Sequence, residues 1–242
     1  MTEKTKAIII LIAVAIAFYI FVGVIQAVSL YLLYGNGILG PVSPLNEFFT
    51  SINYLFAALA QVIFIFFLFK VIKTGKECTN GKFNYNFDKF FYTAFALGIL
   101  KISYTMIFSH LPYWDSRNIA DLIISVLISI VVFSTITELF YRHWTITFLE
   151  KYNFQPRTIC ITSVIMYYVM NHLLYLISIT ELNLGGIMWD ALFYIASGII
   201  LYQLYTKTRD VRYCIIMQMI IATTGAIITA FHSFMLPHAY KI

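Results

Sequence analysis

Charged residues are scarce in this sequence. Only 11% of the 242 residues are Asp, Glu, Lys or Arg, whereas 61% are hydrophobic and 18% are aromatic. Water-soluble domains carry about 25% charged residues, so this composition excludes a soluble domain and predicts a membrane protein. The net charge of +5 does not indicate nucleic-acid binding, because the basic residues lie in short clusters between apolar runs.

Several chemical signatures are also missing. The three cysteines, Cys78, Cys160 and Cys214, match no zinc-ligand spacing, and we expect none of them to form a disulfide. The chain has no glycine-rich phosphate loop and no internal repeat, and its last apolar segment has no lysine for a retinal Schiff base. We therefore expect no cofactor, assign no metal site and exclude a nucleic-acid partner.

Long apolar runs dominate the sequence instead. Each of seven segments is long enough to cross a hydrocarbon core, which takes about 20 helical residues. They cover residues 7–33, 49–71, 91–111, 119–141 or beyond, 158–177, 185–205 and 214–234. We predict an all-α polytopic membrane bundle of about seven transmembrane helices that forms one domain over residues 1–242. No small-residue cleavage site follows the first segment, so we expect a retained anchor.

The basic residues predict an orientation in the membrane. Lysine and arginine gather before the first apolar segment and after the second, fourth and sixth, while the alternate connections are nearly empty of them. The positive-inside rule then places the N-terminus in the cytoplasm and the C-terminus outside. Frequent Ile, Phe, Tyr, Asn and Lys suit an A/T-rich bacterial genome, so we expect a bacterial plasma membrane, with membrane lipids as partners.

Glu138 and Arg142 are the most informative charges at membrane depth. Their four-residue spacing places them on one helix face. Placing a charge inside a bilayer costs free energy, so such residues usually have a functional or structural role. A short basic connection at residues 151–157 predicts a helical hairpin. If it bends near Gln155, Glu138 lies 17 residues before the bend and His172 lies 17 residues after it, so both stand about 25 Å from it. We expect Glu138 and His172 to meet.

A Glu–His contact with Arg142 one turn away could hold and deprotonate a water molecule for attack on a peptide bond. The alternative is a buried polar network that fixes helix packing. Lys101, in the middle of the third segment, needs a carboxylate or water, and an ion pair or a snorkelling side chain would explain it. A transporter that uses Lys101, Asp121 and Asp190 as pathway charges is a further hypothesis, although the chain lacks the internal repeats of many transporters.

At these residues the chain resembles the CPBP family, also called Abi. This family comprises intramembrane endopeptidases that include the CAAX prenyl proteases, together with bacteriocin-processing and immunity proteins. Residues 137–142 resemble its EExxxR motif, with Thr137 in place of the leading Glu. Residues 168–172 look like its FxxxH motif, with Tyr168 for Phe, Asn171 before the histidine, and His172 itself.

The family's third motif, HxxxN, is the least similar. The register places Gln218 at its histidine and Ala222 at its asparagine. His232 is the other candidate for that histidine, but Leu236 stands at the asparagine position, and His232 lies near the expected outer face. We prefer Gln218, so the resemblance extends over a core of about residues 119–222.

The resemblance implies roles for these residues. In the family, the leading Glu activates water, the second Glu and the Arg support it, and the His and Asn residues polarise water or hold the oxyanion. Carried over, this makes Glu138, Arg142 and His172 the catalytic candidates, and Thr137, Tyr168, Asn171 and Gln218 the supporting ones. Threonine cannot act as a general base near neutral pH, and glutamine can donate a hydrogen bond but cannot shuttle a proton.

Two functions therefore compete. The substitutions favour a non-catalytic or weakened homologue, a pseudoenzyme that acts in bacteriocin immunity or as a scaffold for a membrane protein or peptide. The retained Glu138, Arg142 and His172 keep open an active Glu/His-dependent intramembrane endopeptidase that cleaves a membrane-anchored or lipidated peptide.

Overall fold

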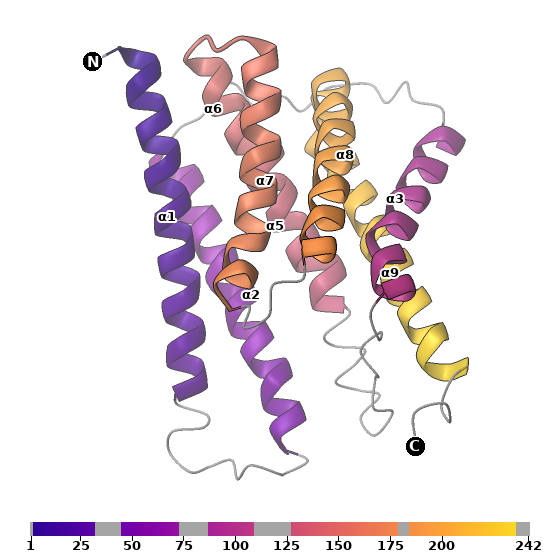
Figure 1. Ribbon diagram of the computed structural model, residues 1–242. Helices are drawn as coiled ribbons and strands as arrows, with labels where there is room; N and C mark the ends of the chain where they lie inside the picture. The colour runs from indigo at the N-terminus through magenta and orange to yellow at the C-terminus, as the bar shows by residue number, and fades with distance from the viewer. Residues whose placement is uncertain (1, 32–44, 73–86, 109–126, 179–183, 236–242) are drawn as a thin grey trace. The chain divides into compact units, whose positions relative to one another are not determined.

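The structure, a computed structural model, describes residues 2–31, 45–72, 87–108, 127–178 and 184–235 (Figure 1). Within these ranges all regular secondary structure is helical, and no strand is present. The helices are α1 (Glu3–Leu30), α2 (Leu45–Val71), α3 (Phe87–Phe108), η3 (Ile128–Phe133), α5 (Ser134–Glu138), η4 (Leu139–Trp144), α6 (Thr145–Lys151), α7 (Pro156–Ser178), α8 (Leu184–Thr208) and α9 (Val211–Met235).

The seven predicted apolar segments are all helical where the structure describes them. The fourth differs most, because η3, α5, η4 and α6 follow one another without a break and carry this helical run on to Lys151. Its predicted first residues, 119–126, lie outside the described ranges. The run ends at the predicted hairpin bend, where Asn153 takes a left-handed φ of 55°, which Asn tolerates better than most residues. Pro156 then starts α7, a position that suits its fixed φ.

Within the described part of the chain, three helices are long and apolar enough to cross a membrane. The candidate spans are Glu3–Ile25, Ile187–Thr208 and Val211–Ile228. On α1, large aliphatic side chains such as Ile8, Ile12 and Ile16 are exposed, as a lipid-facing helix requires. Seven crossings, and the orientation with the N-terminus inside and the C-terminus outside, stay predictions.

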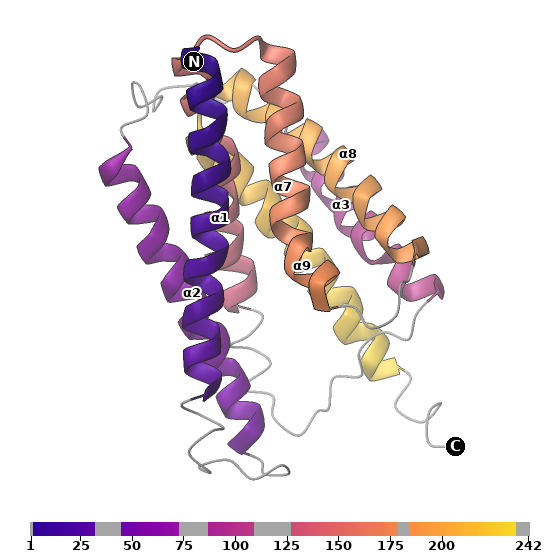
Figure 2. The ribbon, with the colours of Figure 1, turned by 60° about the vertical axis from the view of Figure 1, so that its left-hand side comes forward.

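Chain contacts divide the described residues into two compact units. The first unit contains residues 1–77 and 118–161, and the second contains residues 78–117 and 162–242. In the first unit α1 packs along α2, and α2 contacts η3, α5 and η4 (Figures 1 and 2). Phe18 of α1 joins them, since its ring lies 5.2 Å from Phe64 and stacks on Phe140 at 5.5 Å. The predicted single domain stays a prediction.

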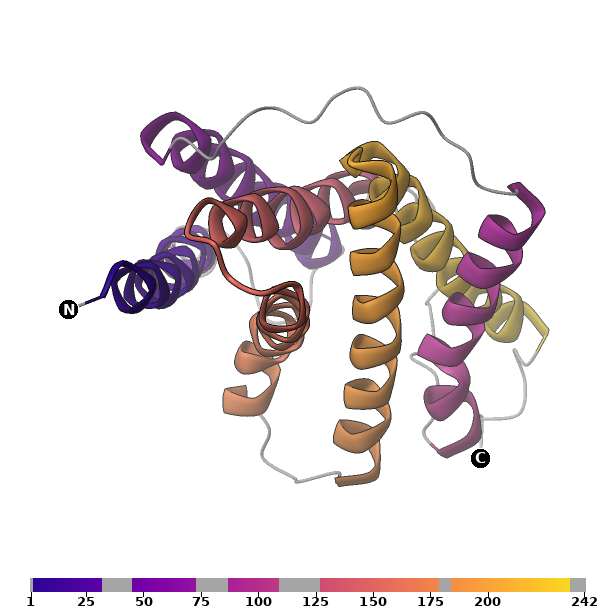
Figure 3. The same cartoon turned by 90° about the horizontal axis from the view of Figure 1, so that it is seen from above.

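In the second unit α3 packs on α9 and α8, and α8 packs on α9 (Figure 3). The crossing of α3 and α9 is close, because a Cβ added at Gly98 would lie 2.6 Å from the Cβ of Thr224. The indole Nε1 of Trp189 donates a hydrogen bond of 2.9 Å to the carbonyl of Leu100, which ties α8 to α3.

A two-residue turn connects α8 to α9. Arg209 has a left-handed φ of 53°, and Asp210 is buried. The Asp210 carboxylate accepts hydrogen bonds from the Arg212 backbone N–H at 3.0 Å and from the Arg212 guanidinium. Asp210 therefore caps the first turn of α9.

The two described cysteines are free thiols, as predicted. Cys160 is half-buried and Cys214 is buried, and the Sγ of Cys214 donates to the carbonyl of Leu201 at 3.5 Å. Cys78 lies outside the described residues.

Candidate functional site around Glu138 and Arg142

Glu138 lies between two π-helical segments. It is the last residue of α5, with η3 before that short helix and η4 directly after Glu138. The hydroxyl of Thr145 donates to the carbonyl of Phe140, five residues earlier, at 2.9 Å. The sequence predicts a regular α-helix here, and the structure differs in these wider turns. Short π-helical segments within helices occur frequently at functional sites.

Glu138 and Arg142 form a fully buried ion pair. Both side chains are 0% exposed, and the Nε of Arg142 lies 3.5 Å from the Oε2 of Glu138. The predicted placement of the two residues on one helix face is therefore correct. Among the described residues, neither carboxylate oxygen of Glu138 has a hydrogen-bond partner. Since an ionised carboxylate can accept several hydrogen bonds, Glu138 keeps acceptor capacity for water or for a peptide N–H.

An aromatic column runs along the same helical run. Trp144 stacks on Phe140 at 5.5 Å and on Phe148 at 5.0 Å, and Phe148 contacts Tyr152 at 5.1 Å. Trp144 is completely buried. Sequence reasoning missed its part in this site, although aromatic residues four positions apart lie on one helix face and gave a signal for the column.

The hydroxyl of Thr137 is bonded within its own helix. Thr137 is half-buried, and its hydroxyl donates to the carbonyl of Phe133, one turn back in its own helix, at 2.6 Å. That proton is therefore occupied in a local hydrogen bond of the kind Ser and Thr commonly make in helices. Across the described ranges, no three His, Cys, Asp or Glu side chains cluster as a metal site would require.

The second unit holds the other predicted site residues. Asn171 and His172 belong to helix α7, but their side chains lie outside what the structure describes. The predicted contact between Glu138 and His172 accordingly stays a prediction. Tyr168 is half-buried, with its ring 6.0 Å from that of Tyr194.

Gln218 is buried in the second unit, with 9% of its surface exposed. Its carbonyl oxygen accepts a hydrogen bond of 3.2 Å from the hydroxyl of Tyr167. Tyr167, the neighbour of the motif residue Tyr168, thus links α7 to Gln218 of α9. Ala222, one turn further along α9, is half-buried and has no polar side-chain group to offer. The His232 and Leu236 side chains lie outside the described residues.

Lys101 has the acidic neighbour that its position requires. It interacts electrostatically with Asp190 of α8, and its Nζ lies 5.9 Å from the centre of the Phe193 ring. The attraction acts between α3 and α8, and the predicted alternatives of an ion pair or a snorkelling side chain for Lys101 stay predictions. Asp121, the third charge of the transporter hypothesis, lies outside the described residues.

The long apolar helices are those of an integral membrane protein. One of its helical runs encloses an acidic and a basic side chain, Glu138 and Arg142. Residues 118–224 match the family model described as Type II CAAX prenyl endopeptidase Rce1-like. This match confirms the predicted resemblance, over a little under half of the chain, and it includes both Glu138 and Gln218. No curated protein and no solved structure matches the chain significantly.

Proposed function

We propose that this chain is a CAAX-protease-like protein of a bacterial plasma membrane that binds a membrane-anchored peptide and cleaves it weakly or not at all. It would act in bacteriocin immunity or as a scaffold for a membrane partner. The observation that carries the proposal is a retained, buried Glu138–Arg142 pair beside Thr137, whose hydroxyl proton is occupied within its own helix.

Retention of a binding site is supported by the carboxylate oxygens of Glu138, which are buried and make no hydrogen bond among the described residues. A buried polar group without a hydrogen-bond partner is costly, and the cost is larger for a charged group. A water molecule or a peptide N–H that donates to Glu138 would offset this cost, so the pair suits a ligand-binding site.

Loss of catalytic power is supported by the substitutions at Thr137 and Gln218. Thr137 cannot take a proton from water near neutral pH. Gln218 accepts a hydrogen bond from Tyr167, and an amide cannot exchange a proton as histidine does. Neither of these two positions therefore carries a side chain that can accept a proton from water near neutral pH.

The proposal is tested with full-length protein in proteoliposomes that contain a lipidated, fluorescently labelled peptide. Binding and cleavage are measured for the wild type, for Glu138→Gln, and for Glu150→Gln as a control that makes the same change on the same helical run. We expect the wild type to bind the peptide with at most slow cleavage. Glu138→Gln should change affinity by less than about tenfold, because the glutamine oxygen still accepts a hydrogen bond. Fast wild-type cleavage would refute the proposal.

The second candidate is an active endopeptidase in which Glu138 acts as the base with His172. The unbonded carboxylate oxygens of Glu138 favour it, because a general base must be able to accept a proton from water. Under this hypothesis Glu138→Gln and His172→Ala each lower the cleavage rate at least about 100-fold, the size expected for losing general-base catalysis. Cleavage that persists in both folded variants would exclude it.

A further inference from the structure

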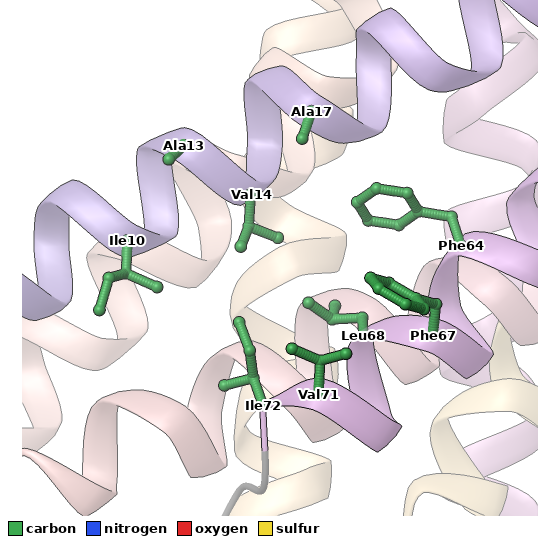
Figure 4. Close-up of a pocket in the computed structure, with 9 residues that line it drawn as sticks. All are labelled: Ile10, Ala13, Val14, Ala17, Phe64, Phe67, Leu68, Val71 and Ile72. Carbon is green, nitrogen blue, oxygen red and sulfur yellow. The ribbon is translucent and has the colours of Figure 1, made fainter.

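An apolar groove of about 320 Å³ lies between α1 and α2 in the first unit (Figure 4). It runs along residues 10–17 of α1 and 64–72 of α2, and all of its lining side chains are hydrocarbon. Val14 faces it from α1, and Phe67 and Leu68 face it from α2 (Figure 4). The groove lies along a candidate membrane span, Glu3–Ile25, and its apolar lining fits a hydrophobic occupant.

Basic residues stand at one end of this groove. Because α1 and α2 run in opposite directions (Figure 1), the last turn of α2 lies at the same end as the first turns of α1. Lys70, in that last turn, is exposed. Lys6, one turn before the groove begins, is 49% exposed and pairs with Glu3 at 2.8 Å. Neither lysine lines the groove itself. Beyond the opposite end, at Ala17 and Phe64, the described residues 18–31 of the first helical segment and 45–63 of α2 contain no lysine or arginine.

We propose that this groove holds one acyl chain of an anionic membrane phospholipid, with the lipid phosphate at the end marked by Lys70 and Lys6. The volume is at the small end of ligand pockets, which suits a single hydrocarbon chain. Basic side chains at the boundary of a membrane helix attract anionic headgroups. The hydrocarbon lining then takes the tail, and the two features together select a lipid with a negative charge over a neutral one.

The proposal is independent of the function proposed for Glu138, because neither Glu138 nor Arg142 lines the groove. Two alanines allow it to be tested by filling the groove. Ala13 and Ala17 line the groove and are exposed, so a larger side chain at either position enters the groove without displacing a buried contact. Ile12 is exposed on α1 but does not line the groove, so Ile12→Trp is the matched control.

The experiment is native mass spectrometry of the full-length protein in detergent, after incubation with mixed micelles that contain equal amounts of dioleoyl phosphatidylglycerol and dioleoyl phosphatidylcholine. The wild type and Ile12→Trp should retain one phosphatidylglycerol molecule. Ala13→Trp and Ala17→Trp should lose at least about four fifths of that retained population, since the added indole occupies the tail position. Lys70→Gln should keep lipid but lose the preference for phosphatidylglycerol.

Circular dichroism identifies which alanine variants are folded, and a single folded variant is sufficient for the comparison. Lipid retention that is unchanged in a folded Ala13→Trp or Ala17→Trp protein would overturn the proposal. Equal retention of the two lipids by the wild type would overturn the role of the basic residues. A lipid-free dimer in the wild type would instead assign the groove to a second copy of the chain.

Discussion

Removal of the Glu138 carboxylate should destabilise the protein far more than removal of both partners of the ion pair. Glu138→Leu leaves the guanidinium of Arg142 in a fully buried position. Replacing Arg142 with Met in the same protein removes that charge as well. We expect the single substitution to cost about 3–5 kcal/mol, and the double substitution to change stability by only about 1 kcal/mol or to stabilise the protein.

The magnitude follows from the geometry of the pair. At an effective dielectric constant of about 20, two unit charges separated by 3.5 Å attract each other by roughly 5 kcal/mol. That attraction offsets the cost of removing both charges from water. When one partner is lost, the other loses the attraction that offset part of its desolvation cost, so we expect each single variant to be less stable than the double variant.

The assay is a double-mutant cycle on the free energy of unfolding, measured by denaturant titration in detergent micelles with wild type, both single variants and the double variant. The expected coupling energy is about 3 kcal/mol or more. Additive effects, or a single-variant cost below about 1 kcal/mol, which is typical of exposed pairs, would refute the idea that the pair is buried and charged.

Three further predictions concern stability. Gly98→Ala should cost about 1–3 kcal/mol, because the new Cβ meets Thr224 at 2.6 Å; a stability equal to that of the wild type in the same titration would contradict the close crossing of α3 and α9. Trp144→Ala should cost about 3–5 kcal/mol, since it empties a fully buried position stacked between two phenylalanines, and a loss below about 1 kcal/mol would disprove this packing. The hydrogen bonds from Arg212 hold the pKa of Asp210 below its ordinary value, so its stabilising contribution is present above the unfolded-state pKa of about 3.9 and is lost as the pH falls through the lower folded-state pKa. Asp210→Asn should therefore flatten the loss of thermal stability on acidification, and an unchanged pH profile would rule out this contribution.

Sequence patterns were sufficient to predict most of the helices and the Glu138–Arg142 pair. Apolar runs of membrane length imply helices because every backbone polar group must be bonded within its own segment. The four-residue spacing of Glu138 and Arg142 placed them on one face, and the short basic connection at residues 151–157 predicted the bend where Asn153 and Pro156 lie. These features depend on local chain geometry, which sequence reading captures.

Features that depend on packing between helices were not predictable in the same way. The π-helical turns around Glu138 were not predicted, because apolar periodicity does not distinguish a π-helical turn from an α-helical one. Tyr167 and Tyr168 are adjacent in sequence but point about 100° apart on a helix, so the motif alone could not show that Tyr167 binds Gln218. The electrostatic partner of Lys101 belongs to a different helix, α8.

The central claim is that Thr137 limits catalysis at a retained site. Its most direct test is the cleavage rate of a lipidated peptide in proteoliposomes by Thr137→Glu, which restores the family's leading carboxylate. Thr135→Glu is a matched control, because the hydroxyl of Thr135 makes the same bond one turn back in the helix, to Val131 at 2.6 Å. The account predicts slow wild-type cleavage and an increase of about 100-fold or more in Thr137→Glu alone, the contribution of a positioned general base. A wild type that cleaves rapidly, and that loses activity in Thr137→Glu, would contradict it.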